Sequence, residues 1–399
     1  MKHVSRILST YSADTFGVCS ALYELGGMIV IHDPSGCNTT HDEPRWFAEP
    51  SQIFISALTE QDAILGNDSK LIADIAEAAK DLRPRFICLI PSQIAHMIAT
   101  DCRAICRILE KKTGIPAFTL PTNSMHYYER GIFFALQKLA ELACQALPEA
   151  AAPRRLPEAK WLSEEELHKL RQGKGRALRV NLLGATPLDF SLNGSILSLR
   201  RWLEARGCHV ASCWAMGSAL DAILASHEAD LDLVLSYGGL GAARVLHERA
   251  GIPYRIGIPF PHCASARGDA ACPPEGPAYI IGETVFAESL SRALEAAIGL
   301  PFTAIVPMET DDELLLPGTL RLTDEDELSP VLREAALIIA DPLYQPICPA
   351  GAAFLSLPHI AFSGRLYEKT IPNLIEEEAF TDFVQKVQKN LGKLPQNRV

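Results

Sequence analysis

The chain has 399 residues, a formal net charge of −11 and an isoelectric point near 5.5. Hydrophobic residues make up 48% and charged residues 21% of the chain, which is typical of a folded globular protein and excludes a disordered or fibrous one. Lys and Arg are nowhere concentrated enough to neutralise a phosphate backbone, so we expect no binding to nucleic acid. No apolar run is long enough to span a membrane, and residues 1–8 contain no apolar stretch of signal-peptide length. We therefore expect a cytoplasmic protein that does not bind a membrane.

Apolar strand-like runs alternate with helical patterns through residues 1–147, which we expect to form a first Rossmann-like domain. Gly114 ends one of the helices. The expected strands are 28–31, 53–56, 85–90 and 117–120, and the expected helices are 70–82, 101–112 and 128–147.

Residues 148–176 are rich in Pro, Ala and charges and are predicted to be a connector with one short helix near Ser163. The alternation then resumes in a second Rossmann-like domain, 177–275, with expected strands 177–183, 209–212 and 231–236 and expected helices 194–206 and 242–250. A third domain, 276–399, has expected strands 278–282 and 336–340 and ends in a C-terminal helix. Repeated strand–helix alternation predicts an α/β fold in which mostly parallel sheets are covered by helices.

Two cysteines near the start of the chain each lie close to a glycine. Cys19 follows Gly17 and Val18, and Cys37 closes the turn Asp33-Pro-Ser-Gly-Cys. A cysteine directly after such a glycine can expose its sulfur where backbones approach closely, which suits a soft metal or an iron–sulfur cluster. The alternative is that both are core thiols, as most of the eleven cysteines of a reduced cytoplasmic chain would be.

A polar turn follows about twenty residues later, in the run Thr59-Glu-Gln-Asp62 with Gly66 after it. Thr59 can cap a helix, and Glu60 and Asp62 in its first turn are favourable against the helix dipole.

In this order and spacing, the segments around Cys19, Cys37 and Thr59 resemble the nitrogenase component 1 superfamily. The resemblance is strongest over residues 10–120 and only topological beyond. It implies three Rossmann-like modules and a [4Fe–4S] cluster shared between two subunits. It also places the Thr59 turn near that cluster and at the subunit interface.

The resemblance assigns Cys19 to the first cluster-ligand position and Cys37 to the second. The third position would follow the strand 85–90, where this chain has Ser92, a harder and weaker ligand than thiolate. Two cysteines from each of two identical subunits would still supply four thiolates, and a heterodimer with a paralogous component 1 subunit would serve equally well.

The resemblance also implies a separate ATP-hydrolysing iron–sulfur reductase as the electron donor. This chain has no Gly-x-x-x-x-Gly-Lys-Ser/Thr loop, so ATP hydrolysis must belong to that partner. His32 and His41 flank Cys37 and are candidate proton donors to a substrate beside the cluster, although an exposed loop also collects such residues.

A nitrogenase proper ligates its large cofactor through a cysteine in the second domain and a histidine in the third. Here the segment 235–241 has no cysteine, and His359 matches the family histidine only loosely, so we do not expect dinitrogen reduction. The glycine run Gly238–Gly241 either holds an anion where a strand meets a helix or allows close packing there.

The sequence therefore predicts a catalytic-component subunit of a nitrogenase-like reductase that acts on a small-molecule substrate. Two alternatives remain open: a non-catalytic scaffold for assembly of a metallocofactor, and a cluster-free protein that binds a small molecule between its modules. The sequence identifies neither the substrate nor the choice between homodimer and heterodimer.

Overall fold

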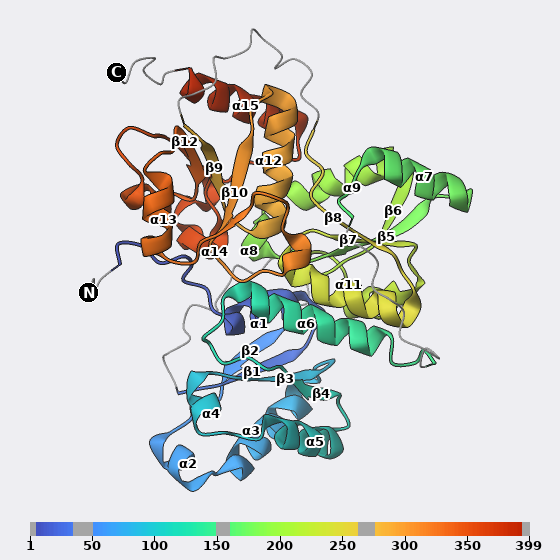
Figure 1. The fold of residues 1–399 in the computed structure, drawn as a ribbon. Helices are drawn as coiled ribbons and strands as arrows, with labels where there is room; N and C mark the ends of the chain where they lie inside the picture. The colour runs from blue at the N-terminus through green and yellow to red at the C-terminus, as the bar shows by residue number, and fades with distance from the viewer. Residues whose placement is uncertain (1–4, 35–50, 149–159, 262–275, 393–399) are drawn as a thin grey trace.

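The computed structural model describes residues 5–34, 51–148, 160–261 and 276–392. It contains three sheets of four, four and five strands, all of whose strand pairs are parallel, with helices on their faces (Figure 1). The predicted α/β fold of three Rossmann-like modules is confirmed. No helix among the described residues is long and apolar enough to cross a bilayer.

The first sheet has the strand order β2-β1-β3-β4, with Ile29, Ile31, Cys88 and Ile90 buried at its centre. Its strands are β1 (Met28–His32), β2 (Gln52–Ile55), β3 (Ile87–Pro91) and β4 (Ala117–Thr119). Its helices are α1 (Asp14–Leu22), α2 (Glu60–Leu65), α3 (Asp68–Leu82), α4 (Gln93–Met97), α5 (Cys102–Thr113) and α6 (Tyr128–Ala143).

The second sheet has the order β6-β5-β7-β8. Its strands are β5 (Leu178–Leu183), β6 (Cys208–Cys213), β7 (Leu231–Val234) and β8 (Tyr254–Ile256). Its helices are α7 (Glu164–Lys174), α8 (Pro187–Phe190), α9 (Ser195–Ala205), α10 (Leu220–Leu224) and α11 (Tyr237–Ala250). Trp161, in the stretch predicted as a connector, forms a parallel bridge with Ile256 and so extends the β8 edge.

The third sheet has the order β11-β10-β9-β12-β13. Its strands are β9 (Ala278–Ile281), β10 (Phe302–Val306), β11 (Leu320–Arg321), β12 (Leu337–Ala340) and β13 (Ala353–Ser356). Its helices are α12 (Thr284–Ile298), α13 (Glu325–Leu332), α14 (Ile360–Ser363) and α15 (Glu377–Leu391). The N-terminal segment joins this module, because the Arg6 guanidinium pairs with the Glu325 carboxylate at 2.8 Å and the Ser9 hydroxyl donates to the Thr323 carbonyl at 2.7 Å.

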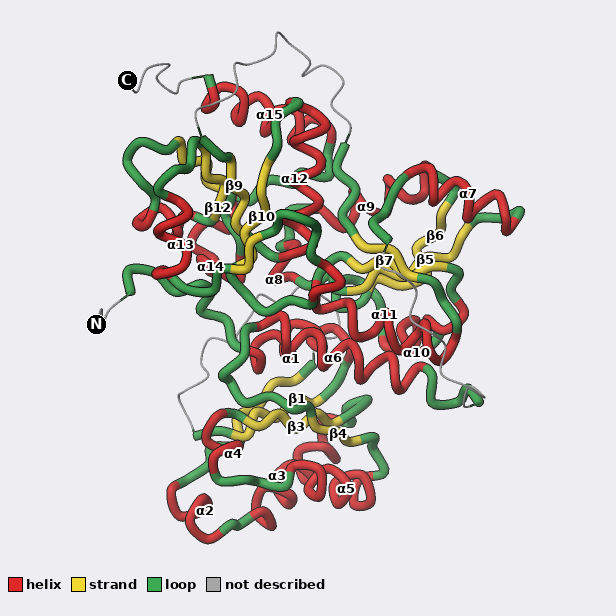
Figure 2. Tube along the Cα trace, viewed as in Figure 1, coloured by secondary structure: helices red, strands yellow, loops and turns green. Residues whose placement is uncertain are grey.

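Helices α1, α6 and α11 pack together between the first sheet and the other two modules (Figure 2). Gly17 of α1 and Gly131 of α6 allow the two backbones to touch, since a Cβ at Gly17 would overlap the Tyr128 carbonyl and a Cβ at Gly131 would overlap the Asp14 carbonyl. This close crossing brings the start of α6 to the centre of the molecule.

The glycine run Gly238–Gly241 lies inside α11, which begins at Tyr237 and not near residue 242 as predicted. A Cβ at Gly239 would lie 2.5 Å from the Leu183 carbonyl oxygen, and one at Gly241 would lie 2.9 Å from the Phe133 ring. Close packing of α11 against β5 and α6 therefore explains these glycines, as the packing interpretation of the run expected.

Candidate functional site

The carboxyl ends of the first sheet gather the polar residues predicted from the sequence. His32 ends β1 and is 4% exposed, and its Nδ1 lies 2.8 Å from the Ser56 hydroxyl just after β2. Burial lowers the pKa of His32, with nearby Asp68 and Asp33 acting in the opposite direction. The imidazole is therefore mainly neutral at pH 7, so any proton it transfers must come from its N–H group.

Ser92 follows β3 and is 2% exposed. Its hydroxyl lies 2.9 Å from the His32 carbonyl oxygen and within hydrogen-bond reach of the Asp33 carboxylate. These contacts tie the end of β3 to the segment that leads into Cys37. Ser92 thus has a positioning role in the structure, and its predicted role as a cluster ligand stays a prediction.

The turn at Thr59 is a capping box. The Thr59 hydroxyl accepts from the Asp62 backbone N–H at 3.1 Å, and the Asp62 carboxylate accepts from the Thr59 backbone N–H at 3.4 Å. The predicted helix cap is confirmed, and it fixes where α2 leaves the edge of the sheet.

Cys19 lies in the middle of α1, where it is 2% exposed in the hydrophobic core beneath Cys88 of β3. Burial raises its pKa to about 12, which disfavours the thiolate that a cluster needs. Its sulfur does not reach a surface in this conformation. Ligation by Cys19 stays a prediction from the resemblance and would require α1 to rearrange.

Cys37 and His41, the other two predicted site residues, lie outside the described residues. Within the described ranges, no group of three or more His, Cys, Asp or Glu side chains is placed to hold a metal ion. The described residues therefore do not fit a cluster site by themselves.

A second gathering of polar side chains lies where the three modules meet. Asp189 comes shortly after β5, Glu283 directly follows β9 and Gly282, and His359 follows β13, so all three stand beyond carboxyl ends of parallel strands. Tyr128 and Glu129 reach the same place from the start of α6. Such crevices beyond strand ends are where open α/β sheets bind ligands.

Asp189 is held by two hydroxyl groups from two modules. The Tyr128 hydroxyl donates to Asp189 Oδ1 at 2.6 Å, and the Thr186 hydroxyl donates to Asp189 Oδ2 at 3.1 Å. Burial is the largest influence on this carboxyl and, with the nearby Glu283 charge, raises its pKa to about 8. Asp189 therefore keeps its proton at neutral pH.

Glu283 supplies a carboxylate to two helix N-termini. It accepts from the Tyr237 N–H at the start of α11 at 2.8 Å and from the Phe286 N–H in the first turn of α12 at 2.9 Å. Burial raises its pKa to about 7, while these backbone donors act in the opposite direction. Of the pair, Glu283 is the better placed to carry the negative charge and Asp189 the proton.

His359 lies beside Asp189, with its Nε2 3.6 Å from Asp189 Oδ1. Its Nδ1 accepts from the Ala361 N–H at 3.2 Å, so in the neutral ring the proton is on Nε2 and faces the carboxyl group. Burial lowers the pKa of His359 to about 4, so the ring is neutral at pH 7. Asp341 holds this loop by accepting from the His359 N–H at 2.8 Å.

Glu129 is 1% exposed, and neither of its carboxylate oxygens has a hydrogen-bond partner among the described residues. Burial, together with the charges of Asp189 and Glu283, raises its pKa well above the usual range. Glu309, which acts on it in the same direction, pairs with His126 Nδ1 at 2.6 Å in a partly exposed position. The junction therefore contains acids that favour the protonated form.

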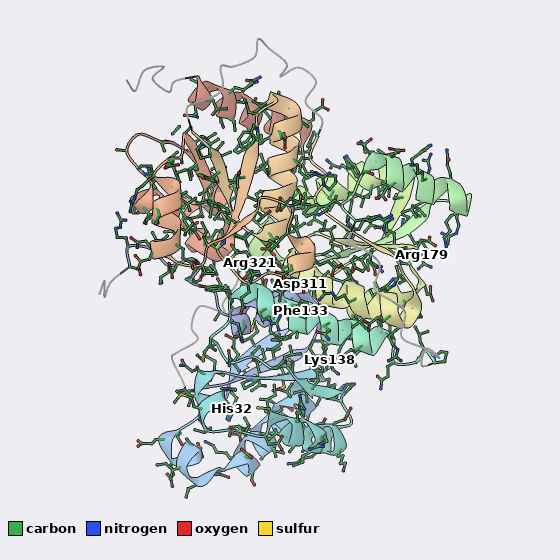
Figure 3. All side chains as sticks on the ribbon, in the orientation of Figure 1. His32, Phe133, Lys138, Arg179, Asp311 and Arg321 are labelled. Carbon is green, nitrogen blue, oxygen red and sulfur yellow. The ribbon has the colours of Figure 1, made fainter. Side chains whose placement is uncertain are left out.

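A small cavity of about 50 Å³ adjoins Asp189 and His359 between the second and third modules. The rest of its lining is mostly apolar and includes Phe260, Phe362 and Leu374. His32 lies in the N-terminal module, apart from Phe133 and Asp311, which mark where α6 meets the third module (Figure 3). The structure thus has two polar centres and does not bring His32 or Ser92 to the acids of the junction.

Four residues of the junction were not predicted from the sequence as site residues: Asp189, Glu283, Tyr128 and Glu129. Asp189 and Glu283 could have been predicted, because each closely follows a run expected to be a strand, and ligands of open α/β sheets bind beyond the carboxyl ends of strands. Tyr128 and Glu129 have no such signal, because they look like the first turn of an ordinary amphipathic helix. His359 was named only as a loose match, and the structure brings it next to Asp189.

The chain matches the model of the family described as nitrogenase component 1 type oxidoreductase over residues 15–267, more than half of its length. The chain belongs to this family. That result agrees with the resemblance noted around Cys19, Cys37 and Thr59.

Among curated relatives, the chain is 26% identical to the nitrogenase iron-molybdenum cofactor biosynthesis protein NifE of Clostridium pasteurianum, over 56% of this chain and 44% of that protein. It is 27% identical to one subunit of the light-independent protochlorophyllide reductase of Prosthecochloris aestuarii, over 52% of this chain and 34% of that protein. The chain thus spans less than half the length of either relative. A solved structure described as nitrogenase Cp1 at pH 5 superposes with a TM-score of 0.62 at 14% identity, covering 98% of this chain and 90% of that one, which establishes the fold alone.

Proposed function

We propose that this chain is the catalytic-component subunit of a nitrogenase-like reductase, and that it reduces a small molecule held at the junction of its three modules. The observation that carries the proposal is the buried pair of Asp189 and His359 beside a cavity. Reduction of an unsaturated bond consumes protons as well as electrons, so the site needs a group that is protonated at neutral pH and can release that proton.

Asp189 suits this role because burial keeps it protonated near pH 7. Asp189 itself lines the cavity and can release its proton to a substrate atom there, while the neutral His359 ring, with its proton on Nε2, faces the carboxyl group and orients it. Tyr128 and Thr186 hold the carboxyl group in place. Asp341 holds the backbone of His359, so the two groups keep their mutual orientation.

An iron–sulfur cluster would supply the electrons, delivered by a separate ATP-dependent reductase as the resemblance predicts. Cys37 from each of two subunits is its first proposed ligand, with Cys19 or a residue of a paralogous partner subunit completing the set. Ser92 would hold the approach to Cys37 through its contacts with His32 and Asp33. His41 remains a candidate proton donor.

Anaerobic purification with iron and sulfide analysis, followed by EPR after reduction, tests the redox part. We expect about four irons per dimer, the content of one [4Fe–4S] cluster. Cys37→Ala should abolish them and Cys348→Ala, a change of the partly buried thiol in the third module, should not. Protein that stays free of iron after reconstitution contradicts the proposal.

Infrared difference spectroscopy tests the proton-donor part without needing the substrate. We expect the carbonyl stretch of a protonated carboxyl group at pH 7 that is lost in Asp189→Asn. A spectrum unchanged by Asp189→Asn would remove Asp189 as the donor.

A metallocofactor assembly scaffold is the second candidate, favoured by the similarity to a cofactor biosynthesis protein. A scaffold would take up a metallocofactor and pass it to an acceptor protein, and this transfer would not depend on Asp189. Transfer activity that survives Asp189→Asn, with no reduction detected, would favour the scaffold over the reductase.

A further inference from the structure

An open groove of about 760 Å³ lies between the second and third modules. Helices α9 and α12 border it, and the chain leaving β8 forms its floor (Figure 1). Ile258 and Phe260 line this groove and also the small cavity beside Asp189, so their side chains separate the two spaces. Its volume falls within the range of small-molecule sites.

Two indole rings line the groove. Trp161 packs over Gly257, where a Cβ would lie 3.3 Å from the ring, so the glycine allows the indole to lie against the backbone of the floor. Trp202, on α9, carries the Arg206 guanidinium 3.9 Å from its ring centroid. Arg206 is fixed in turn by the Glu164 carboxylate at 2.6 Å, so its charge is already compensated. Both rings are only partly buried, which leaves aromatic surface facing the groove.

On the α12 side of the groove, a positive charge has no ion-pair partner among the described residues. The Arg292 guanidinium lies 5.6 Å from the Trp161 ring centroid and has no ion pair with any residue in the described ranges. Ser289, one turn earlier on the same helix, accepts from the Ile258 N–H at 3.0 Å, and its hydroxyl proton has no acceptor in the described part of the chain. Further along α12, Ala293, Ala296 and Ala297 continue the lining of the groove with small side chains.

We propose that this groove binds a planar aromatic carboxylate. The rings of Trp161 and Trp202 offer flat apolar surface that favours a flat conjugated ligand, since aromatic rings pack in offset-stacked or edge-to-face arrangements. The Arg292 guanidinium donates to the carboxylate, and the Ser289 hydroxyl can supply a second hydrogen bond. Arg292 is the group that selects an anion over a neutral ligand of the same shape. This site is independent of the proposed reductase activity.

Calorimetric titration of the full chain with three probes tests the proposal. The probes are 2-naphthoate, its neutral analogue 2-naphthamide, and cyclohexanecarboxylate, which keeps the charge but is not planar. We expect saturable binding of 2-naphthoate to one site and at least roughly tenfold weaker binding of the other two, because each lacks one of the two interactions.

Arg292→Gln should weaken 2-naphthoate roughly tenfold and leave 2-naphthamide nearly unchanged, since only the charged contact is lost. Arg321→Gln is the matched control: it removes the same charge from the same module, at a surface pair with Asp312 outside the groove, and should change neither affinity. Trp202→Phe, which keeps an aromatic ring, should weaken both naphthalene probes.

Three results would overturn the proposal. The first is the absence of saturable 2-naphthoate binding to protein whose thermal melt is normal. The second is equal affinity of Arg292→Gln and the unchanged chain for 2-naphthoate. The third is binding of cyclohexanecarboxylate as tight as that of 2-naphthoate, which would mean that the indole rings do not select a planar ligand.

Discussion

The Tyr128 hydroxyl donates a hydrogen bond of 2.6 Å to Asp189, and this contact joins the first module to the second at the centre of the molecule. Tyr128 is fully buried at the start of α6, and Asp189 stands beyond β5 with only 6% of its side chain exposed. Because the carboxyl group lies so far from solvent, its ionisation is tied to the stability of the whole fold.

Stability should fall as pH rises from about 4 towards 8, where Asp189 ionises in the native state. Across that window the unfolded chain has lost the Asp189 proton and the native chain keeps it, so unfolding releases a proton and raising the pH favours unfolding. The slope is about 1.4 kcal/mol per pH unit for one such group, and it levels off above the native pKa. Glu283 contributes in the same direction up to about pH 7. Urea denaturation from pH 5 to 9 measures the slope.

Asp189→Asn should reduce the slope of this dependence by the contribution of one group, because asparagine keeps an oxygen that can accept from Tyr128 but does not ionise, while Glu283 still contributes. Asp221→Asn, at an exposed carboxylate paired with Arg85, is the control and should leave the slope unchanged. Parallel stability curves for Asp189→Asn and the unchanged chain would mean that Asp189 is ionised in the native protein at neutral pH.

Glu129→Gln should leave the free energy of unfolding at pH 4 within about 1 kcal/mol of the original value, since a neutral amide replaces a neutral acid of the same shape. At pH 7 the variant should be the more stable of the two, because burial raises the native pKa of Glu129, so unfolding of the original chain releases the Glu129 proton and is favoured as pH rises. Chemical denaturation at both pH values checks this. Strong destabilisation by Glu129→Gln at pH 7 would show that the carboxylate is charged and paired.

Gly17→Ala should destabilise the fold by about 3 kcal/mol or more, because the added Cβ overlaps the Tyr128 carbonyl where α1 crosses α6. Gly173→Ala in α7 is the matched control: nothing among the described residues lies within 4 Å of its Cβ position, so alanine should stabilise that helix by about 0.5–1 kcal/mol. Thermal or urea unfolding compares the two. Similar stability of both variants would mean that the helices can separate without cost.

Ser92→Ala should lower stability by about 1–3 kcal/mol, since it removes the hydroxyl that bridges His32 and Asp33. Ser69→Ala, at an exposed serine of α3, serves as the control and should be nearly neutral. If Ser92 only positions the segment that leads into Cys37, the Ser92→Ala variant should still bind iron when iron and sulfide are in excess, but with lower affinity. Complete loss of iron from a folded variant would instead support direct ligation by Ser92.

Cys19→Ala should cost about 1 kcal/mol, the usual effect of removing a small buried group, and its iron content tests whether Cys19 or a residue of a paralogous partner subunit completes the ligand set of Cys37. The matched control is Cys88→Ala, which changes the neighbouring buried thiol of β3. Iron analysis of both folded variants decides whether Cys19 is a cluster ligand. Loss of iron from Cys19→Ala alone would establish Cys19 as a cluster ligand and would require α1 to open when the cluster binds.

The local periodicity of the sequence predicted all four strands of the first sheet, β5, β6 and β7 of the second, and β9 and β12 of the third, because each is a short apolar run bounded by turn residues. Met28–His32 and Leu178–Leu183 illustrate this. The strands β8, β10, β11 and β13 were not predicted. The helix cap at Thr59 could also be predicted from the sequence, since a capping box depends on residues three apart in the chain. The boundaries of the elements were predicted less accurately than the elements themselves. Helix α11 begins five residues before the expected 242, because its first turns contain glycines that are needed for close contact with α6 and β5.

The sequence by itself determined the class of fold and the family, since both depend on patterns that are local in the chain. Only the tertiary structure decided which side chains share an environment. It brought Tyr128, Asp189, Glu283 and His359 to one buried junction, although they are spread over more than 230 residues. It also enclosed the Cys19 thiol in the core. Burial and through-space charge set the proton affinity of these groups, and neither quantity is encoded in the spacing of residues along the chain.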